Sequence, residues 1–496
     1  MHRRKALLWI LLLSVLSACG EKDPSLRQRP APAESVAVSS KTEEAVHAEA
    51  VDPRPEVLRI LAPKPDGRDS ACYAEVYETL YTLSEGKRSP LLAGGEAEHE
   101  SGSGEYRIAL RSDVCDSEGR PFSAALAAVA YSEQAGGSLL LSAEVSEDGK
   151  LCLHFSRELD EKEADHWFCA VPLFAENGVG TGPYRIAEED SESLLLLPNE
   201  AYWGEKEKRQ NLQSIRYLFI SDAPAQVMAL ETDKADAALR LSYADAEDFL
   251  PGGTYSDLFY TVDHFSGIGR YLLPNVGKGS TVEEEALRLS LFRALDGSAL
   301  AERLGGQACT ALGNPELVTP AQGFTSYQTV SENENEEALR QLGLTLLTPD
   351  GEEARRTAAA VQSQWEQQGV RVRLLCLAEE EYREALAAAE SWDMALVETA
   401  PAASVTEQWA ELWDYDKKNT QLRGKLNDAT LHNLLQTALD GETASAENLQ
   451  RLQERVYNHA LAYALPQLNE PLILPMTMRK SVLNGEVLLP GSCEYE

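Results

Sequence analysis

The stretch of sequence that decides the fold is Gly178–Leu239, which reads GVGTGPYRIAEEDSESLLLLPNEAYWGEKEKRQNLQSIRYLFISDAPAQVMALETDKADAAL. We expect it to contain, in order, a turn (180–184), a strand (184–187), a second strand (215–220) and a short amphipathic helix (223–231). Gly180 and Gly182 permit backbone angles that a Cβ would forbid, and Pro183 fixes φ at the start of the first strand. The residues therefore indicate a sharp turn that either lies against a ligand or forms a plain loop.

The order of short motifs here resembles that of the bacterial peptide/nickel-type solute-binding proteins of family 5, the extracytoplasmic receptors of ABC importers. After the GTGPY turn come the family's Asn-x-x-Tyr-Trp-Gly block at 199–204 and an Ala-Asp-Ala-Ala run at 235–238. Further blocks agree with the family's Y-E-x-L segment (77–80), its "dG.p" turn (118–122) and its V-R-x-A-L-x-x-A-I-D helix (287–296). The resemblance implies an α/β, two-lobed periplasmic-binding-protein-like fold (type II, Venus-flytrap) with a discontinuous first lobe.

Four residues inside these motifs are expected to have structural roles. Tyr202 and Trp203 are adjacent on a segment that looks extended, so they should point to opposite faces and pack in the core. Arg288 and Asp296 occupy the charged positions of the helix motif, where we expect them to hold helix surfaces rather than to touch ligand.

The first 18 residues match a lipoprotein signal peptide. A basic head is followed by an apolar run from Ala6 to Leu16, which is eleven residues long, whereas a membrane-spanning helix needs roughly 20. Leu16-Ser17-Ala18-Cys19 matches a lipobox, so we expect lipidation at Cys19. Residues 19–55 have no aromatic residue and no apolar periodicity, and should form a disordered tether reaching roughly 30 Å from the membrane.

The net charge bears on the binding partners of the protein, and the cysteine content bears on its disulfides. The formal charge of −35 disfavours nucleic acid and anionic membrane surfaces, and mildly favours neutral or cationic solutes. After Cys19 seven cysteines remain, an odd number without a C-x-x-C motif, so at least one is unpaired. Most of them are expected to be small buried residues, while export would permit a bridge.

The chain is too long for one core and is expected to form two lobes. The predicted first lobe covers 56–274, to which 470–496 returns, and the predicted second lobe covers 275–469. The first lobe should open with a strand at 57–61 and a helix at 72–80, and its last strand, 269–274, should cross to the second lobe. Two or more connections between the lobes would make a hinge.

One unit follows from periodicity alone. A strand at 342–347, a helix at 352–368 that ends at Gly369, and a strand at 370–377 predict a parallel pair joined by a helix. A second helix (378–391) and a strand (392–398) extend the pattern. Ligands gather at the carboxyl ends of the strands in such sheets, here near Glu398, Thr399 and Ala400.

The candidate ligand-binding residues lie at predicted strand ends or lobe crossings, and they are Tyr81, Thr181, Tyr184, Asn275, Glu398 and Thr399. Peptide-binding members of the family carry a Trp-x-x-Asp-Tyr run after the strand equivalent to 392–397, and its aspartate faces the α-amino group of the peptide. This chain has Val397-Glu398-Thr399-Ala400-Pro401-Ala402-Ala403 there, so the amine clamp does not carry over. Glu398 is a candidate to replace the aspartate, although a glutamate at a strand end is more often solvated.

No enzyme, metal or cofactor site is expected. The sequence contains no H-E-x-x-H, G-x-S-x-G or G-x-x-x-x-G-K-[ST] motif, and its histidines lack the spacing of a preformed zinc site. Binding of nickel within a small-molecule chelate remains an alternative, because a chelated metal needs few ligands from the protein.

Two functions follow from these observations. The first is the solute-binding component of an ABC importer, a lipid-anchored extracytoplasmic monomer that closes on an oligopeptide or similar small solute and delivers it to permease and ATPase partners. The alternative is a lipid-anchored sensor or interaction protein with a degenerate ligand pocket.

Overall fold

In the computed structural model the described residues are 54–439 and 446–496, except 66, 68, 69, 85, 135–138, 175–178, 266, 278, 310, 314–326, 328–338, 401–404 and 414–427. Residues 1–53 form a unit separate from 54–496. The predicted signal peptide, Cys19 and nearly all of the predicted tether lie outside the described residues.

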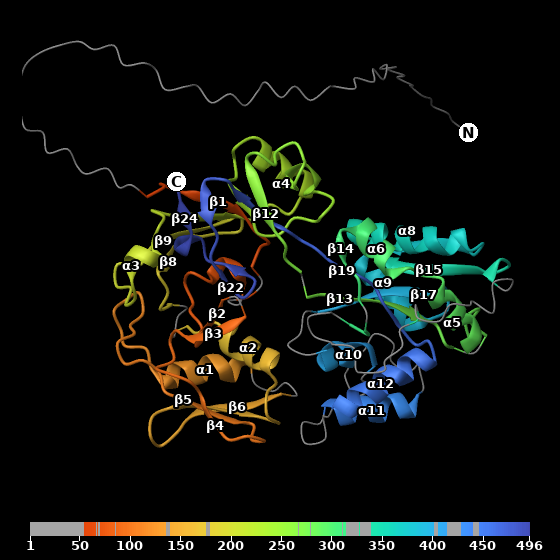
Figure 1. Ribbon diagram of the computed structural model, residues 1–496, viewed down its shortest axis with the longest axis horizontal. Coiled ribbons are helices and arrows are strands. Elements are labelled where there is room, and N and C mark those ends of the chain that lie inside the picture. Colours follow the sequence, from red (N-terminus) through yellow and green to blue (C-terminus); the bar gives the residue numbers. More distant parts are fainter. Residues whose placement is uncertain are drawn as a thin grey trace, which may run out of the picture. The chain divides into compact units, whose positions relative to one another are not determined.

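A seven-stranded sheet is built from both ends of the folded chain (Figure 1). Its order is β12 (Phe259–Val262), β20 (Leu472–Pro475), β11 (Ala237–Ala238), β1 (Leu58–Leu61), β10 (Ile215–Leu218), β9 (Ser193–Pro198) and β8 (Tyr184–Glu189). β1 pairs parallel with β10 and β11, and β20 pairs antiparallel with β11 and β12. β20, from the C-terminal segment, therefore lies in the same sheet as β1. Helices α3 (Lys206–Arg209) and α4 (Ala223–Glu231) lie in the connections.

A four-stranded antiparallel sheet lies within the same half of the chain, in the order β4 (Glu98–His99), β5 (Glu105–Ile108), β7 (Leu151–Phe155) and β6 (Leu140–Val145). Helices α1 (Ala124–Gln134) and α2 (Glu161–Cys169) cover one face of it (Figure 1). Leu151, Leu153 and Phe155 of β7 point into the core that the helices share with this sheet. The alternate residues of β7 therefore face the other side.

A five-stranded sheet carries the separate core of the second half, in the order β16 (Arg371–Leu377), β15 (Gly343–Pro349), β17 (Met394–Thr399), β13 (Gly269–Pro274) and β18 (Tyr463–Ala464). Its helices are α5 (Glu285–Arg293), α6 (Gly297–Leu304), α8 (Glu352–Gln367), α9 (Glu379–Ala388), α10 (Val405–Trp413), α11 (Ala429–Leu439) and α12 (Ala446–Asn458). The strand that we expected to cross between the lobes is β13, and it belongs to this sheet, between β17 and β18.

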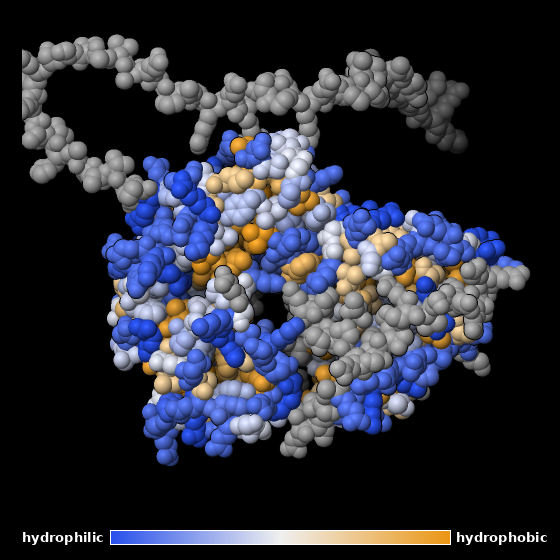
Figure 2. Space-filling model, in the orientation of Figure 1, coloured by the Kyte–Doolittle hydropathy of each residue, from blue (hydrophilic) through white to orange (hydrophobic). Residues whose placement is uncertain are grey.

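The remaining strands form two-stranded ribbons. The pairs are β2 (Tyr81–Ser84) with β3 (Lys87–Pro90), β14 (Gly306–Gln307) with β19 (Gln467–Leu468), β21 (Met478–Lys480) with β24 (Glu494–Tyr495), and β22 (Leu483–Asn484) with β23 (Val487–Leu488). Hydrophilic residues cover most of the face shown in Figure 2, in keeping with the acidic composition.

The predicted strand–helix–strand unit is confirmed. β15 pairs parallel with β16 in the register Leu344↔Val372, and the predicted inner face of α8 is buried at Ala354, Ala358, Val361 and Trp365. Gly369 ends the unit's helix at a φ of 88°, a value that favours glycine.

The helix predicted at 72–80 is wrong. The chain there forms a short 3₁₀ turn at Ala71–Tyr73 and then runs irregularly to β2. The carbonyl oxygens of Glu75 and Val76 accept hydrogen bonds from the N–H groups of Tyr184 and Gly182, at 2.9 Å each. Tertiary hydrogen bonds to the GTGPY turn thus replace the local ones that a helix would make.

Candidate functional site

The GTGPY turn is a packing element of the protein itself. A Cβ added to Gly180 would overlap the carbonyl oxygen of Val76, and one on Gly182 would overlap that of Glu75. Glycine is therefore needed at both positions, because the turn must approach the 75–78 backbone closely enough to hydrogen bond with it. Of the two roles left open by the sequence, close contact with a ligand or a plain loop, neither describes this turn.

Glu78 is a buried carboxylate held by donors from three directions. Its oxygens accept hydrogen bonds from Thr181 Oγ1 (3.1 Å), Tyr202 OH (3.1 Å) and Trp203 Nε1 (2.9 Å), and Arg209 Nη2 lies 3.8 Å away. Tyr202 and Trp203 thus converge on one group, and the expectation that they point to opposite faces is wrong. The reason is that 199–204 is a turn and not an extended segment.

Glu75 lies beside this cluster and is fully buried. Burial raises the pKa of Glu75 to about 7, while Arg209 and the N–H group of Gly491, which donates to Oε1 at 2.6 Å, oppose the rise. Both carboxyl groups belong to the interior, where Glu75 joins the 71–78 segment to the C-terminal segment and Glu78 joins it to the GTGPY turn and the Tyr-Trp pair.

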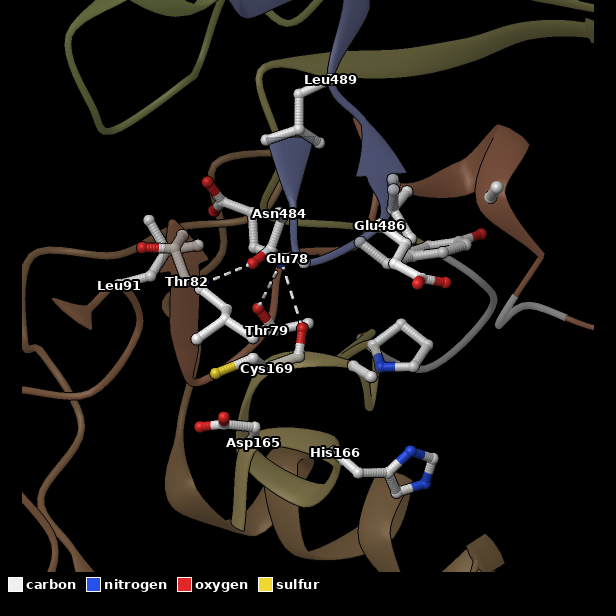
Figure 3. Close-up of a pocket in the computed structure, with 18 of the residues that line it drawn as sticks. Glu78, Thr79, Thr82, Leu91, Asp165, His166, Cys169, Asn484, Glu486 and Leu489 are labelled. Atoms are coloured by element: carbon white, nitrogen blue, oxygen red, sulfur yellow. Dashed lines mark hydrogen bonds between the residues drawn. The ribbon is translucent and has the colours of Figure 1, made fainter. Parts of the chain in front are cut away.

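A first cavity of about 580 Å³ opens next to this cluster (Figure 3). Its wall comes from the 70–83 segment, from α2 and from the β22–β23 ribbon. Asn484 links the three, because its Oδ1 accepts from Leu83 N (2.7 Å) and its Nδ2 donates to Cys169 O (3.1 Å). Among the lining side chains are Tyr73, Tyr77, Leu83, Leu91 and Leu489, together with the charged Lys162, Asp165, Arg209 and Glu486.

A second cavity, of about 540 Å³, lies at the carboxyl ends of β15, β16 and β17, and we call it the acidic cavity. This is the sheet edge at which the sequence predicts ligand. Arg270 is its one lining cation against six lining carboxylates, which are Asp350, Glu352, Glu353, Glu379, Glu398 and Glu470.

Arg270 is buried, with 4% of its surface exposed, and joins two of these carboxylates. Its Nε donates to Glu398 Oε1 at 2.8 Å and its Nη2 to Glu353 Oε2 at 2.9 Å. Among the described residues, neither Arg270 Nη1 nor Glu353 Oε1 has a hydrogen-bond partner. Burial also raises the pKa of Glu470. The acidic cavity thus has a strongly anionic lining, and two of its lining residues each keep one buried polar atom without a partner.

The two cavities are connected through the segments by which the chain passes between the sheets. The N–H group of Glu470 donates to the carbonyl of His264 (2.8 Å), and His264 Nε2 lies 3.6 Å from Glu486 of the first cavity. Asn469 ties the segments together, since its Oδ1 accepts from His264 N (3.0 Å) and its Nδ2 donates to Asp263 (2.6 Å).

Of the candidate ligand-binding residues, only Glu398 lines the acidic cavity. Tyr81 lines a smaller cavity of about 250 Å³ and donates to Gly95 O (2.8 Å). The other four are buried, and their side chains form hydrogen bonds within the protein. The hydrogen-bonded pairs are Thr181 with Glu78, Tyr184 with Leu212, Asn275 with Ala389 and Trp392, and Thr399 with Gly269.

Sequence reasoning did not select Arg270, Glu353 or Glu470, which share the acidic cavity with Glu398. Glu353 follows the Pro-Asp-Gly turn after a strand, so its place at the sheet edge was a usable signal. Arg270 and Glu470 carry no such signal, because they reach the cavity only through strand pairing and chain crossing.

Comparison with known proteins places the chain in a class. Residues 169–421 match the model of the middle region of the bacterial extracellular solute-binding proteins, family 5, and the chain belongs to this family. The family is one of solute-binding proteins rather than enzymes. No curated protein sequence matches the chain significantly.

Solved structures agree in fold. NikA from Brucella suis, in complex with Fe(III)-EDTA, is 18% identical, with a TM-score of 0.69 over 90% of this chain and 100% of that one. A putative peptide binding protein AppA from Clostridium difficile is 16% identical, with a TM-score of 0.69 over 89% and 100%. AppA from Bacillus subtilis, in complex with a nonapeptide, is 14% identical, with a TM-score of 0.64 over 89% and 99%. In the part of the chain that the structure describes, no helix is both long and apolar enough to cross a membrane.

Proposed function

We propose that this chain is the extracytoplasmic solute-binding component of an ABC importer and takes a peptide or similar small solute in the acidic cavity. The observation that carries the proposal is the cavity of about 540 Å³ at the carboxyl ends of β15, β16 and β17, which Arg270 and six carboxylates line among the described residues. Ligands of open α/β sheets bind at this edge. A peptide brings an ammonium group that the carboxylates attract.

The charge of the cavity narrows the solute class. Six carboxylates against one arginine favour a solute that carries ammonium groups over an anionic one. The aspartate with which family members bind the α-amino group of a peptide is missing here. Glu398 is already ion-paired with Arg270. We therefore propose that Glu398 attracts the amino group together with the other carboxylates of the cavity and not alone. The similar structures hold a nonapeptide in one case and metal chelates in others, which supports a peptide or a chelate of comparable size.

Binding is proposed to close two lobes about the crossing segments. We place the first lobe at 56–262 with 470–496 and the second from β13 to 469, because β13 pairs with β17 and β18. The first cavity then lies on one lobe and the acidic cavity on the other, with His264 and Glu470 between them. A solute that contacts both stabilises the closed state by its extra affinity for that state.

Delivery requires partners and an anchor. Permease and ATPase subunits carry out transport, and the lipid at Cys19 would hold this monomeric receptor at the outer side of the membrane. The alternative of a sensor without a ligand pocket gains no support, because the acidic cavity is present and polar.

Thermal-shift measurements with synthetic tripeptide pools sorted by net charge test the proposal. Pools with free amino groups and positive charge should raise the midpoint, and acidic pools should not. Glu398→Gln and Glu353→Gln should weaken binding of trilysine by about 10-fold or more, as expected for loss of a charged hydrogen bond. The exposed Glu366→Gln is the matched control. A protein that no pool stabilises, and that carries no ligand in native mass spectrometry, would rule out peptide uptake.

A further inference from the structure

The four-stranded sheet brings together side chains that are far apart in the sequence. Glu105 of β5 is paired with His154 of β7, and Glu144 of β6 is paired with Cys152 of β7. Cys152 and His154 alternate with the core residues Leu151, Leu153 and Phe155, so they lie on the face of the sheet opposite α1 and α2. Three neighbouring strands therefore present sulfur, nitrogen and oxygen atoms on one face.

Three of these residues lie close enough together to share one metal ion. Cys152 Sγ lies 3.4 Å from His154 Nε2, and His154 Nε2 lies 3.2 Å from Glu144 Oε1. One ligand atom from each of Glu105, Cys152 and His154 lies within 4.8 Å of the others. Bonds of about 2.0–2.3 Å around a tetrahedral Zn²⁺ place neighbouring ligand atoms about 3.3–3.6 Å apart.

We propose that Cys152, His154 and Glu105 form a site for a borderline divalent cation, Zn²⁺, on the outer face of the four-stranded sheet, with Glu144 beside the imidazole. Thiolate and imidazole ligands select Zn²⁺ over Ca²⁺ and Mg²⁺, which prefer oxygen alone. The imidazole Nε2 is near both the sulfur and the Glu144 carboxylate, and a single proton on it serves only one of them at a time. A cation satisfies the sulfur, the imidazole and the Glu105 carboxylate at once. Its role is structural, because it would join β5 and β7.

One neighbouring charge opposes the metal. Arg107 lies opposite Cys152 on β5 and donates from Nε to Glu105 Oε1 at 2.6 Å. Its side chain is half exposed, so it is free to turn into solvent when Glu105 binds a cation. Arg107 lowers the affinity of the site, and Arg107→Gln should therefore bind Zn²⁺ more tightly than the unmodified protein.

The test is calorimetric titration of ZnCl₂ into the chelator-treated full-length protein, with CoCl₂ as a spectroscopic probe. We expect one tightly bound Zn²⁺, a melting midpoint that rises with zinc concentration, and for Co²⁺ the thiolate charge-transfer and visible bands of a tetrahedral site. Cys152→Ser and His154→Gln should each weaken binding by at least about 100-fold, since loss of even an outer partner costs about 10–100-fold. Cys376→Ser, on β16, is the matched control and should bind normally.

Several outcomes would overturn the proposal. The first is the absence of one-to-one binding, and the second is a Co²⁺ spectrum without a thiolate band. The third is equal affinity for zinc in Cys152→Ser, His154→Gln and the control, because this result would mean that zinc binds only to the acidic surface. If a variant fails to fold, the Co²⁺ spectrum of the unmodified protein still shows whether a thiolate binds the metal. His154 is partly exposed, so its replacement gives a second variant that does not disturb the core.

Discussion

At the scale of single residues, the chain uses buried charges as structural connectors. Glu78 collects donors from the GTGPY turn and from the Tyr-Trp pair, and Glu75 collects one from the C-terminal segment. The motifs that identify the family are therefore the parts that hold the segment around 75–78 in place. The side chains of Glu78, Thr181 and Tyr202 are buried in the protein and bond to one another.

Glu78→Gln should destabilise the protein by about 1–3 kcal/mol. The amide NH₂ group must face either Arg209 and Tyr202 or Thr181 and Trp203, so in either orientation it meets groups that donate to the carboxylate. Urea unfolding measures the loss. Trp203→Phe, which removes one donor and keeps the carboxylate, should cost less, and an equal or larger loss would contradict this account.

Glu75→Gln should flatten the dependence of stability on pH. The pKa of Glu75 is raised to about 7 in the folded protein, so its protonated form is favoured by folding. That contribution is complete below pH 4.5 and is lost as pH rises through 7. The unmodified protein should therefore lose about 2–3 kcal/mol more than the variant between pH 5 and pH 8.

Unfolding midpoints in urea at the two pH values give the comparison for Glu75. The exposed Glu366→Gln makes the same charge change on the surface and should follow the unmodified protein. A variant whose stability falls with pH as steeply as that of the unmodified protein would show that Glu75 is ionised throughout.

At the scale of elements, Arg288 joins the start of α5 to the end of α12. The buried guanidinium donates to the carbonyls of Val282 and Glu283, and to those of His459 and Ala460 just after α12. These carbonyls lie in the segments that precede α5 and follow α12, so one side chain ties the two segments together. This agrees with the expectation that Arg288 holds helix surfaces. Asp296 does the same by capping α6, accepting from Ser298 N and Ala299 N.

Arg288→Met should cost about 3 kcal/mol or more, because several buried carbonyls lose their donors together. Arg288→Lys should recover part of the loss, since an ammonium group reaches fewer acceptors than a guanidinium fork. Thermal unfolding is the measurement, and the exposed Arg303→Met is the control. Equal stability of Arg288→Met and the control would refute the role of Arg288.

The elements that could be predicted from the sequence are those whose pattern is local. The unit from β15 to β16 was found because Ala354, Ala358, Val361 and Trp365 repeat at helical spacing and a glycine ends the helix. The 72–80 segment has similar apolar spacing, but Gly180 and Gly182 approach it and their turn takes over its hydrogen bonds. The sequence of the 72–80 segment itself contains no sign of this distant turn.

The candidate site was less predictable than the fold. Glu398 was found because a strand end marks the sheet edge, but its partners Arg270 and Glu470 arrive from distant strands. The same holds for the proposed zinc ligands, since Glu105 meets His154 only through the register of β5 on β7. Histidine spacing along the chain carries no information about such pairing.

At the scale of the whole molecule, the proposed lipidation of Cys19 can be tested directly. Cys19→Ala should remove lipid attachment and release the protein from the membrane fraction, because a lipidated amino terminus is the only anchor that the sequence predicts. Labelling with a radioactive fatty acid, followed by fractionation, gives the result. Cys376→Ser serves as the control and should keep the label, and a label that survives Cys19→Ala would exclude lipidation at this position.

The position of β20 between β11 and β12 has a consequence for how the protein acquires its structure. The strands on either side of it leave the export channel some two hundred residues earlier than β20 does, as their numbering shows. The five-stranded sheet and its core are contained in 269–468, so that portion is complete while the larger sheet still lacks the strand between β11 and β12. A nascent molecule therefore exposes two open strand edges until its last thirty residues emerge, which is the period when it most needs protection from aggregation.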